Sequence, residues 1–364
     1  MHASQPPSLP RRFVSSFSAV REQQEAKRLL EAAIADGPAH AYLFHGPAGV
    51  GKSTIARLFG RALLKTDRDV HPDLYELEPL GDMIRIDAVR ELRRDLHMRP
   101  FEGDRRVYIV HGADRLGTDA SDSLLKDLEE PPPYAVIILI ADDLGPISAT
   151  IRSRCQLVRF RRLSERAVRE VVDARVPDAS PERRTALARV AGGRLDRLER
   201  LLDPGSAARR DRLVEVARSV YRDPAFDSTS AAEVLLECPK ERAEHARAIE
   251  EARIAQLDLP EKEAEQRIKR AQRGAERDEL LAQLEELAGW YRDLVVVGVG
   301  AESAAIHLDR MEQLKADASR ERLVGAENAA EFVRAAWRRL EEFNLSSQLA
   351  LEALWIRLHR ELAT

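Results

Sequence analysis

Residues 46–53 read Gly-Pro-Ala-Gly-Val-Gly-Lys-Ser, and this segment constrains the fold more than any other part of the chain. It follows the short apolar run 41–44 and opens an amphipathic stretch that continues toward Lys65, which predicts a strand, a glycine-rich loop and a helix in succession. Glycines let backbone N–H groups turn inward around phosphate oxygens, and the helix N-terminus adds partial positive charge. The spacing therefore predicts a phosphate-binding loop.

Each component of such a loop is present. Lys52 is placed to reach the outer phosphates of a nucleotide, and the hydroxyl of Ser53 can hold magnesium. The alternative is a glycine turn that only caps a helix. The nucleotide-binding residues that we expect are Gly46, Pro47, Ala48, Gly49, Val50, Gly51, Lys52, Ser53 and Thr54.

The chain has 364 residues, which favours roughly two or three domains. Up to Phe160, short apolar runs alternate with amphipathic helical patterns, as in an α/β domain with a parallel sheet. After Leu163 only helical periodicity remains. We expect an α/β domain over 1–162, a helical lid over 163–204 and a helical domain over 205–364, with a charged helical insertion around 239–277. The predicted strands are 41–44, 74–77, 107–110, 136–141 and 156–160.

Composition excludes several classes of protein. Cys155 and Cys238 lie far apart in the sequence and form neither a CxxC pair nor a disulfide framework. A net charge of −4 argues against a strong autonomous grip on nucleic acid. The run 294–301 is too short to span a bilayer, and residues 1–12 lack the apolar core of a signal peptide. We expect a cytoplasmic protein without membrane contact.

The residues after the strand 107–110 do not suit nucleotide hydrolysis. That reaction requires a carboxylate to hold magnesium and usually a second acid to orient the attacking water. The two positions after the strand are His111 and Gly112, and neither can do this work. Asp114 is the nearby acid, and at best it contacts magnesium through water. We therefore expect the loop to bind nucleotide without hydrolysing it, if it binds nucleotide at all.

Several segments together resemble the delta-prime family of bacterial DNA polymerase III clamp-loader subunits, which belongs to the AAA+ class. The related tau/gamma family resembles a working ATPase, with paired acids where this chain has His111 and Gly112, so that difference favours delta-prime. The segments that carry the resemblance occur in the family's order: 40–47, 71–74, 123–132, 151–156 and 348–354.

The resemblance implies roles for three further residues. Arg154, in the segment Ser-Arg-Cys, is similar to an arginine finger that projects into the nucleotide site of a neighbouring subunit. Arg197, after Ala-Gly-Gly, is similar to a nucleotide-sensing arginine, with an ordinary solvated helix residue as the alternative. Asp142 falls where a polar sensor is expected, and an acid there would repel γ-phosphate. Many family members also carry a cysteine-rich zinc module, but residues 66–70 contain no cysteine, so no zinc is expected.

The resemblance also implies a place in an assembly. The partners would be the tau/gamma motor subunits and the delta subunit, with the sliding clamp and primer-template DNA reached through the complex. In that assembly the chain would act as a stator, and its C-terminal helices would form part of a collar. Two alternatives remain open: an active AAA+ ATPase of the tau/gamma type, and an autonomous DNA-binding module suggested by five clustered arginines. These arginines are Arg152, Arg154, Arg159, Arg161 and Arg162.

Overall fold

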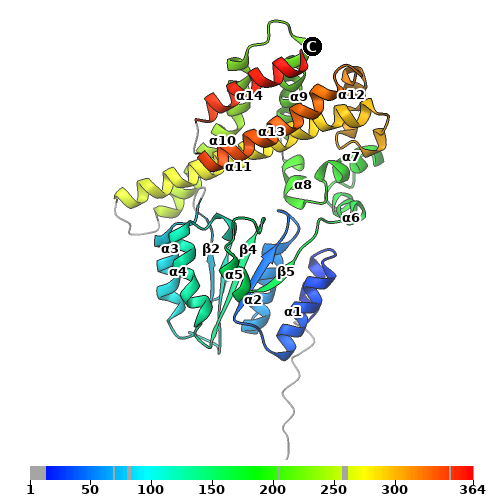
Figure 1. The fold of residues 1–364 in the computed structure, drawn as a ribbon. Coiled ribbons are helices and arrows are strands. Elements are labelled where there is room, and N and C mark those ends of the chain that lie inside the picture. Colours follow the sequence, from blue (N-terminus) through cyan, green and yellow to red (C-terminus); the bar gives the residue numbers. More distant parts are fainter. Residues whose placement is uncertain are drawn as a thin grey trace, which may run out of the picture. The chain divides into compact units, whose positions relative to one another are not determined.

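The computed structural model describes residues 14–68, 70–79, 83–203, 205–255, 261–343 and 346–363 (Figure 1). The chain divides into two compact units. The first comprises Met1–Val168 together with Gly193–Arg197, and the second comprises Arg169–Gly192 together with Leu198–Thr364. The short segment 193–197 therefore returns to the first unit after the chain has entered the second.

The first unit is built on a parallel sheet of five strands in the order β2-β3-β4-β1-β5. Because β1 lies between β4 and β5, the loop that follows β1 begins next to the end of β4. The predicted strands are all confirmed, to within one residue at each end. Their bounds are Ala41–His45, Leu74–Leu77, Arg106–Val110, Ala135–Ala141 and Gln156–Arg159.

Alternating side chains of the strands enter two separate cores, one on each face of the sheet. Tyr42 and Phe44 pack on one face with η1 (Val14–Ala19), α1 (Gln24–Asp36) and α2 (Lys52–Leu64). Leu43 packs on the other face with helices α3, α4 and α5 (Ile86–Leu96, Thr118–Glu129 and Ala149–Arg154). Burial on both faces explains why the strand sequences are continuously apolar.

The second unit contains helices joined by loops, and its described residues form no strand. Apolar side chains at helical spacing from Leu280 to Leu294 are buried in its core, beside Trp290 and Trp355. The predicted order of an α/β domain with a parallel sheet, followed by a helical C-terminal region, is confirmed. The helices beyond α5 are α6 (Glu165–Arg175), α7 (Pro181–Ala191), α8 (Leu195–Leu202), α9 (Ser206–Arg222), α10 (Ser228–Ile254), α11 (Glu261–Gly298), α12 (Met311–Asp317), α13 (Leu323–Phe343) and α14 (Ser347–Leu362).

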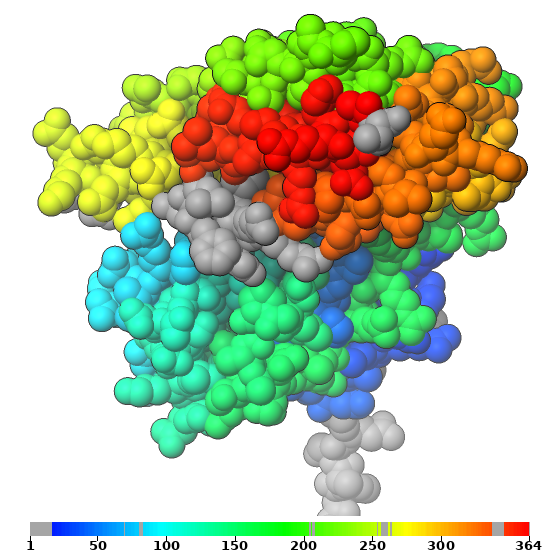
Figure 2. All heavy atoms as spheres, turned by 45° about the horizontal axis from the view of Figure 1, so that its top comes forward, coloured from blue at the N-terminus to red at the C-terminus, as the bar shows by residue number. Residues whose placement is uncertain are grey.

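Helices α10 and α11 pair along their length, and their charged ends project beyond the rest of the second unit (yellow in Figures 1 and 2). This is the region expected to form a charged helical insertion. Near the end of the pair, Arg267 donates a hydrogen bond of 3.0 Å to Glu250, whose side chain is buried. Among the described helices, none has the length and apolarity that crossing a membrane requires.

Candidate functional site

The loop between β1 and α2 has the backbone of a phosphate cradle. Gly46, Gly49 and Gly51 all have positive φ, at 135°, 67° and 96°. A Cβ atom on Gly46 would lie 2.2 Å from the carbonyl oxygen of Phe160, and one on Gly51 would lie 2.8 Å from Val20. Glycine is therefore required both by the left-handed backbone and by the close packing around the loop.

Lys52 begins α2, and its side chain folds back over this loop. Its side chain is only 5% exposed, and its ammonium group donates to the carbonyl oxygens of Gly46 and Pro47 at 2.5 and 2.6 Å. A third bond, of 2.7 Å, joins Lys52 Nζ to Oδ1 of Asp142, the residue that follows β4. All three ammonium protons thus have an acceptor within the protein.

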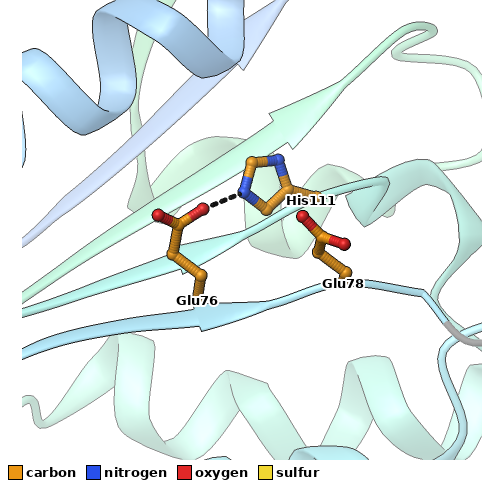
Figure 3. A group of neighbouring side chains, drawn as sticks. All are labelled: Glu76, Glu78 and His111. Atoms are coloured by element: carbon orange, nitrogen blue, oxygen red, sulfur yellow. Dashed lines mark hydrogen bonds and ion pairs between the residues drawn. The ribbon is translucent and has the colours of Figure 1, made fainter. Parts of the chain in front are cut away.

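The next residue, Ser53, contacts an imidazole where a magnesium-binding site would need an acid. Its Oγ lies 3.3 Å from Nδ1 of His111, and Nε2 of the same ring lies 2.8 Å from Oε2 of Glu76 (Figure 3). Gly112 then turns the chain with φ 63°. The loop therefore fits phosphate, whereas the residues beside Ser53 do not supply the carboxylate that usually accompanies magnesium.

Glu76, Glu78 and His111 place ligand atoms within 4.8 Å of one another, a spacing that could suit a metal ion (Figure 3). Arg57 on α2 already neutralises these acids: its Nη2 lies 2.9 Å from Glu76 and 3.7 Å from Glu78. Burial would raise the pKa of Glu76, but hydrogen bonds with Arg57 and His111 hold that pKa below its usual range. Ion pairs and hydrogen bonds among these residues and Arg57 therefore explain why Glu76, Glu78 and His111 lie together, without a metal ion.

Asp114 lies in the short helix η2 (Ala113–Arg115), and its Oδ1 is buried without a hydrogen-bond partner among the described residues. Burial, together with the nearby Asp142 carboxylate, raises the pKa of Asp114. Two carboxylates therefore lie close together on the side of the loop where Lys52 is held.

The returning segment 193–197 packs against the phosphate loop. The amide of Leu195 donates a 2.8 Å hydrogen bond to the carbonyl oxygen of Gly49. A Cβ atom on Gly49 would lie 1.8 Å from Oδ1 of Asp196. The other carboxylate oxygen of Asp196, Oδ2, accepts a hydrogen bond of 2.7 Å from Arg194. Arg197, the predicted sensor, follows directly and is 8% exposed. Its role as a sensor stays a prediction.

Arg154 lies in the last turn of α5, away from the phosphate loop of its own chain. Its Nη2 is 2.6 Å from Oε1 of Glu129 at the end of α4, and its Nη1 donates to the carbonyl oxygen of Thr150 at 3.0 Å. The side chain is 32% exposed. Within the described residues, the contacts of Arg154 are confined to α4 and α5.

Sequence reasoning identified the loop residues, His111, Asp142 and Arg154, but it missed the residues that hold them. Glu76, Glu129 and the Leu195–Asp196 pair come from distant parts of the sequence and were not predicted to contact the site. Glu129 lies inside one of the segments that carry the family resemblance, so it was visible in the sequence without a role. Glu76 had no such signal.

Known proteins resemble this chain in the part that contains the phosphate loop and Arg154. Residues 22–164 match the family described as "DNA polymerase III, delta subunit". The chain is 30% identical over 203 residues to DNA polymerase III subunit delta' of Pseudomonas aeruginosa, covering 50% of this chain and 62% of that protein. It is 31% identical over 185 residues to subunit tau of Bacillus subtilis, covering 45% of this chain and 32% of that protein.

Among solved structures, a DNA polymerase III gamma subunit-related protein of Thermotoga maritima aligns with 94% of this chain and 99% of its own length, at 18% identity and a TM-score of 0.43. The chain spans less than two thirds of the length of the two curated relatives, at 62% and 32%. The resemblance that the sequence motifs indicated is confirmed: this chain is a relative of bacterial DNA polymerase III subunits of the delta-prime and tau type, with the family match on residues 22–164.

Proposed function

We propose that this chain is a delta-prime-type stator subunit of a DNA polymerase III clamp loader. It helps to load the sliding clamp onto primer-template DNA during replication, and its own phosphate loop holds nucleotide without turning it over. Arg154 acts in the nucleotide site of a neighbouring motor subunit. The partners are the tau/gamma and delta subunits, and the clamp and DNA are reached through the assembly in the cytoplasm.

One observation carries this proposal: a complete phosphate loop lies beside a strand end without acids. Ser53 meets His111 at 3.3 Å, and the next position is Gly112. Hydrolysis needs a magnesium-holding carboxylate and a group that orients the attacking water, and neither residue can serve. The chain therefore keeps the residues that recognise phosphate and lacks those that would cleave it. Residues 46–54 and Arg197 would hold the nucleotide.

The environment of Arg154 supports a role in trans. Its guanidinium pairs with Glu129 in a half-exposed position, so the pair is screened by water and separates at low cost. A phosphate group of a neighbouring subunit offers several oxygens to the same planar fork of donors. Such arginine fingers typically contribute about 10³–10⁵ in rate at the site that they serve.

The test is to reconstitute the loader with partner subunits and either wild-type chain, Arg154→Ala or Arg152→Ala. Arg152 is an exposed arginine on the same helix and provides the matched control. We expect all three to assemble, and only Arg154→Ala to lose DNA-stimulated ATPase activity and clamp loading. Unchanged rates for Arg154→Ala would remove this residue from the mechanism.

An active ATPase of the tau/gamma type is the second candidate, favoured by the intact loop and by the similarity to a tau subunit. The purified chain alone distinguishes the two. Multiple turnovers of ATP that disappear in Lys52→Ala would establish the ATPase and reject the stator.

A DNA-binding module is the third candidate, and it is less favoured because at least two of the five clustered arginines are already paired within the chain. Arg154 contacts Glu129, and Arg161 contacts Glu25 at 3.2 Å. Binding of primer-template DNA by the isolated chain, with an affinity that falls steeply as salt rises, would favour this alternative.

A further inference from the structure

The pairing of two strands in the sheet places the carboxylate of Asp142 beside the phosphate loop. Strands β1 and β4 are neighbours, and His45 is paired in register with Ala141. The residues that follow, Gly46 on one strand and Asp142 on the other, therefore leave the sheet side by side. This places Asp142 Oδ1 2.7 Å from Lys52 Nζ, close to the carbonyl oxygen of Gly46, which the same ammonium group contacts at 2.5 Å.

Lys52 thus already has an anionic partner on one side. A phosphate group that enters the cradle must replace at least one of its three acceptors, because an ammonium group has only three protons. The two carbonyl oxygens of the loop are neutral, and a phosphate replaces them with a gain in charge interaction. Replacing Asp142 instead would leave a carboxylate facing the incoming phosphate.

Nucleoside diphosphates and triphosphates differ in whether a phosphate group must enter the space beside Lys52 and Asp142. In a phosphate loop the backbone amides cradle the inner phosphates, and the lysine reaches outward to the terminal one. A diphosphate can occupy the cradle while Asp142 keeps its bond to Lys52. A triphosphate adds a terminal phosphate on the outward side, where Asp142 lies.

A second carboxyl group lies near the space that this terminal phosphate would enter. Asp114 is close enough to Asp142 for the Asp142 charge to add to the effect of burial in raising the pKa of Asp114. Magnesium would normally screen the outer phosphates, but Ser53 contacts the imidazole of His111 where a magnesium-holding acid would lie. Like charges held this close in a partly buried site oppose each other strongly.

We propose that the phosphate loop of this chain selects nucleoside diphosphate over nucleoside triphosphate, and that Asp142 sets this preference by occupying the position of the terminal phosphate. The inference rests on the part of the proposed function in which the loop holds nucleotide. It adds the class of ligand and the residue that determines specificity. The pair of Lys52 with Asp142 is the feature from which it follows.

The experiment titrates ADP and ATP into the full-length chain by calorimetry, each with magnesium and with a chelator. We expect ADP to bind at least tenfold more tightly than ATP in both conditions. In Asp142→Asn, which keeps an oxygen acceptor for Lys52, ATP should gain about tenfold in affinity while ADP changes less than threefold. Lys52→Ala should lose both nucleotides.

Asp143→Asn is the matched control. Asp143 is the adjacent exposed acid, and its Oδ1 accepts the amide of Gly145 at 3.0 Å, which an asparagine oxygen can also do. We expect this variant to bind both nucleotides as the wild type does. Circular dichroism spectra that match the wild type establish that each variant is folded.

Three outcomes would overturn the inference. ATP that binds as tightly as ADP would remove the selectivity, and a loss of magnesium-dependent ATP binding in Asp142→Asn would make Asp142 a metal ligand instead. Absence of binding by wild type and Asp142→Asn alike would show that the loop holds no nucleotide. None of these results bears on clamp loading by the Arg154 variants, so the stator role is tested separately.

Discussion

In the first unit, Lys52 and Asp142 meet at the end of a sheet beside a loop of left-handed glycines, whereas in the second unit Asp317 and Asp293 are enclosed by helices. The side chain of Asp142 is 51% exposed, and those of Asp317 and Asp293 are 0% exposed. Asp317 accepts hydrogen bonds from Arg218 at 2.6 Å and Tyr221 at 2.8 Å, and it also pairs with Arg222.

This difference in exposure helps to distinguish a charged cluster that binds a ligand from one that stabilises the fold. Asp317 and Asp293 are fully buried and have their partners inside the protein, so they hold helices together and have little capacity for a ligand. Among the described residues the carboxylate of Asp142 pairs with Lys52, its side chain is half exposed, and it lies next to backbone that is shaped for phosphate. Exposure and the shape of the neighbouring backbone, rather than charge alone, separate the binding site from the structural cluster.

The largest effect should come from removing Asp317. In Asp317→Ala, the arginines and the Tyr221 hydroxyl lose their shared acceptor inside the core, so we expect the free energy of unfolding to fall by about 3–5 kcal/mol. The three tryptophans of the chain, Trp290, Trp337 and Trp355, all belong to the second unit. Urea unfolding followed by tryptophan fluorescence therefore reports on this unit specifically.

The control for this experiment is Glu265→Ala, which removes an exposed partner of Lys269 on α11. We expect this variant to leave the free energy of unfolding unchanged within the precision of the measurement, because the pair is exposed to water. If Asp317→Ala cost no more than this control, the second unit would not depend on its buried acid, and the contrast with the first unit would fail.

A smaller effect is expected from adding a methyl group to the phosphate loop. Gly46→Ala places Cβ against the Phe160 carbonyl oxygen in a left-handed backbone, so both strain and overlap contribute, with a total of roughly 2–4 kcal/mol. Gly300→Ala has φ 81° but no atom within 4 Å of the new Cβ, so only backbone strain of about 1 kcal/mol applies. Urea unfolding followed by circular dichroism measures both. Equal costs would show that the loop is not closely packed.

A pH dependence should belong to the second unit. His307 is buried, and its Nδ1 lies 2.8 Å from Asp293. Burial alone would lower the pKa of His307, but the hydrogen bond with Asp293 and the negative charges of Asp293 and Glu286 raise it above its ordinary value. Because the folded-state pKa is the higher one, the stabilisation is complete below about pH 6.5, the value for an unfolded chain, and is lost as pH rises through the folded-state pKa.

The measurement is the free energy of unfolding in urea, followed by tryptophan fluorescence, at a series of pH values from below about 6.5 upward. In His307→Gln the fall in stability with rising pH should disappear, while the control His245→Gln, at an exposed position on α10, should retain it. A slope that survives in His307→Gln would assign the pH dependence to another group.

The smallest effect on stability is expected at the proposed binding site. Asp142→Asn keeps an oxygen acceptor for Lys52 and removes a charge that is half exposed, so we expect a change within about 1 kcal/mol. Unfolding followed by circular dichroism checks this value. A loss as large as that of Asp317→Ala would make the Lys52–Asp142 pair a structural element like those of the second unit.

Much of the first unit could be predicted because its signals are local. Each strand is a short continuous apolar run, and the segment 46–53 has a spacing that strongly favours one backbone shape. The positions of His111 and Gly112 directly after a strand could also be read without knowing the fold. The contact of Glu76 with His111 could not be predicted from the sequence, because it depends on β2 and β3 being neighbours in the sheet.

The sequence by itself determined the order of strands and helices, the phosphate loop and the residues at the ends of the strands, because apolar periodicity and glycine spacing act over a few neighbouring residues. Only the tertiary structure decided that Asp142 binds Lys52, that Glu129 holds Arg154 and that residues 193–197 return to the loop. These contacts join residues up to 146 positions apart, Gly49 and Leu195. They follow from which strands become neighbours, and that choice depends on packing across the whole sheet.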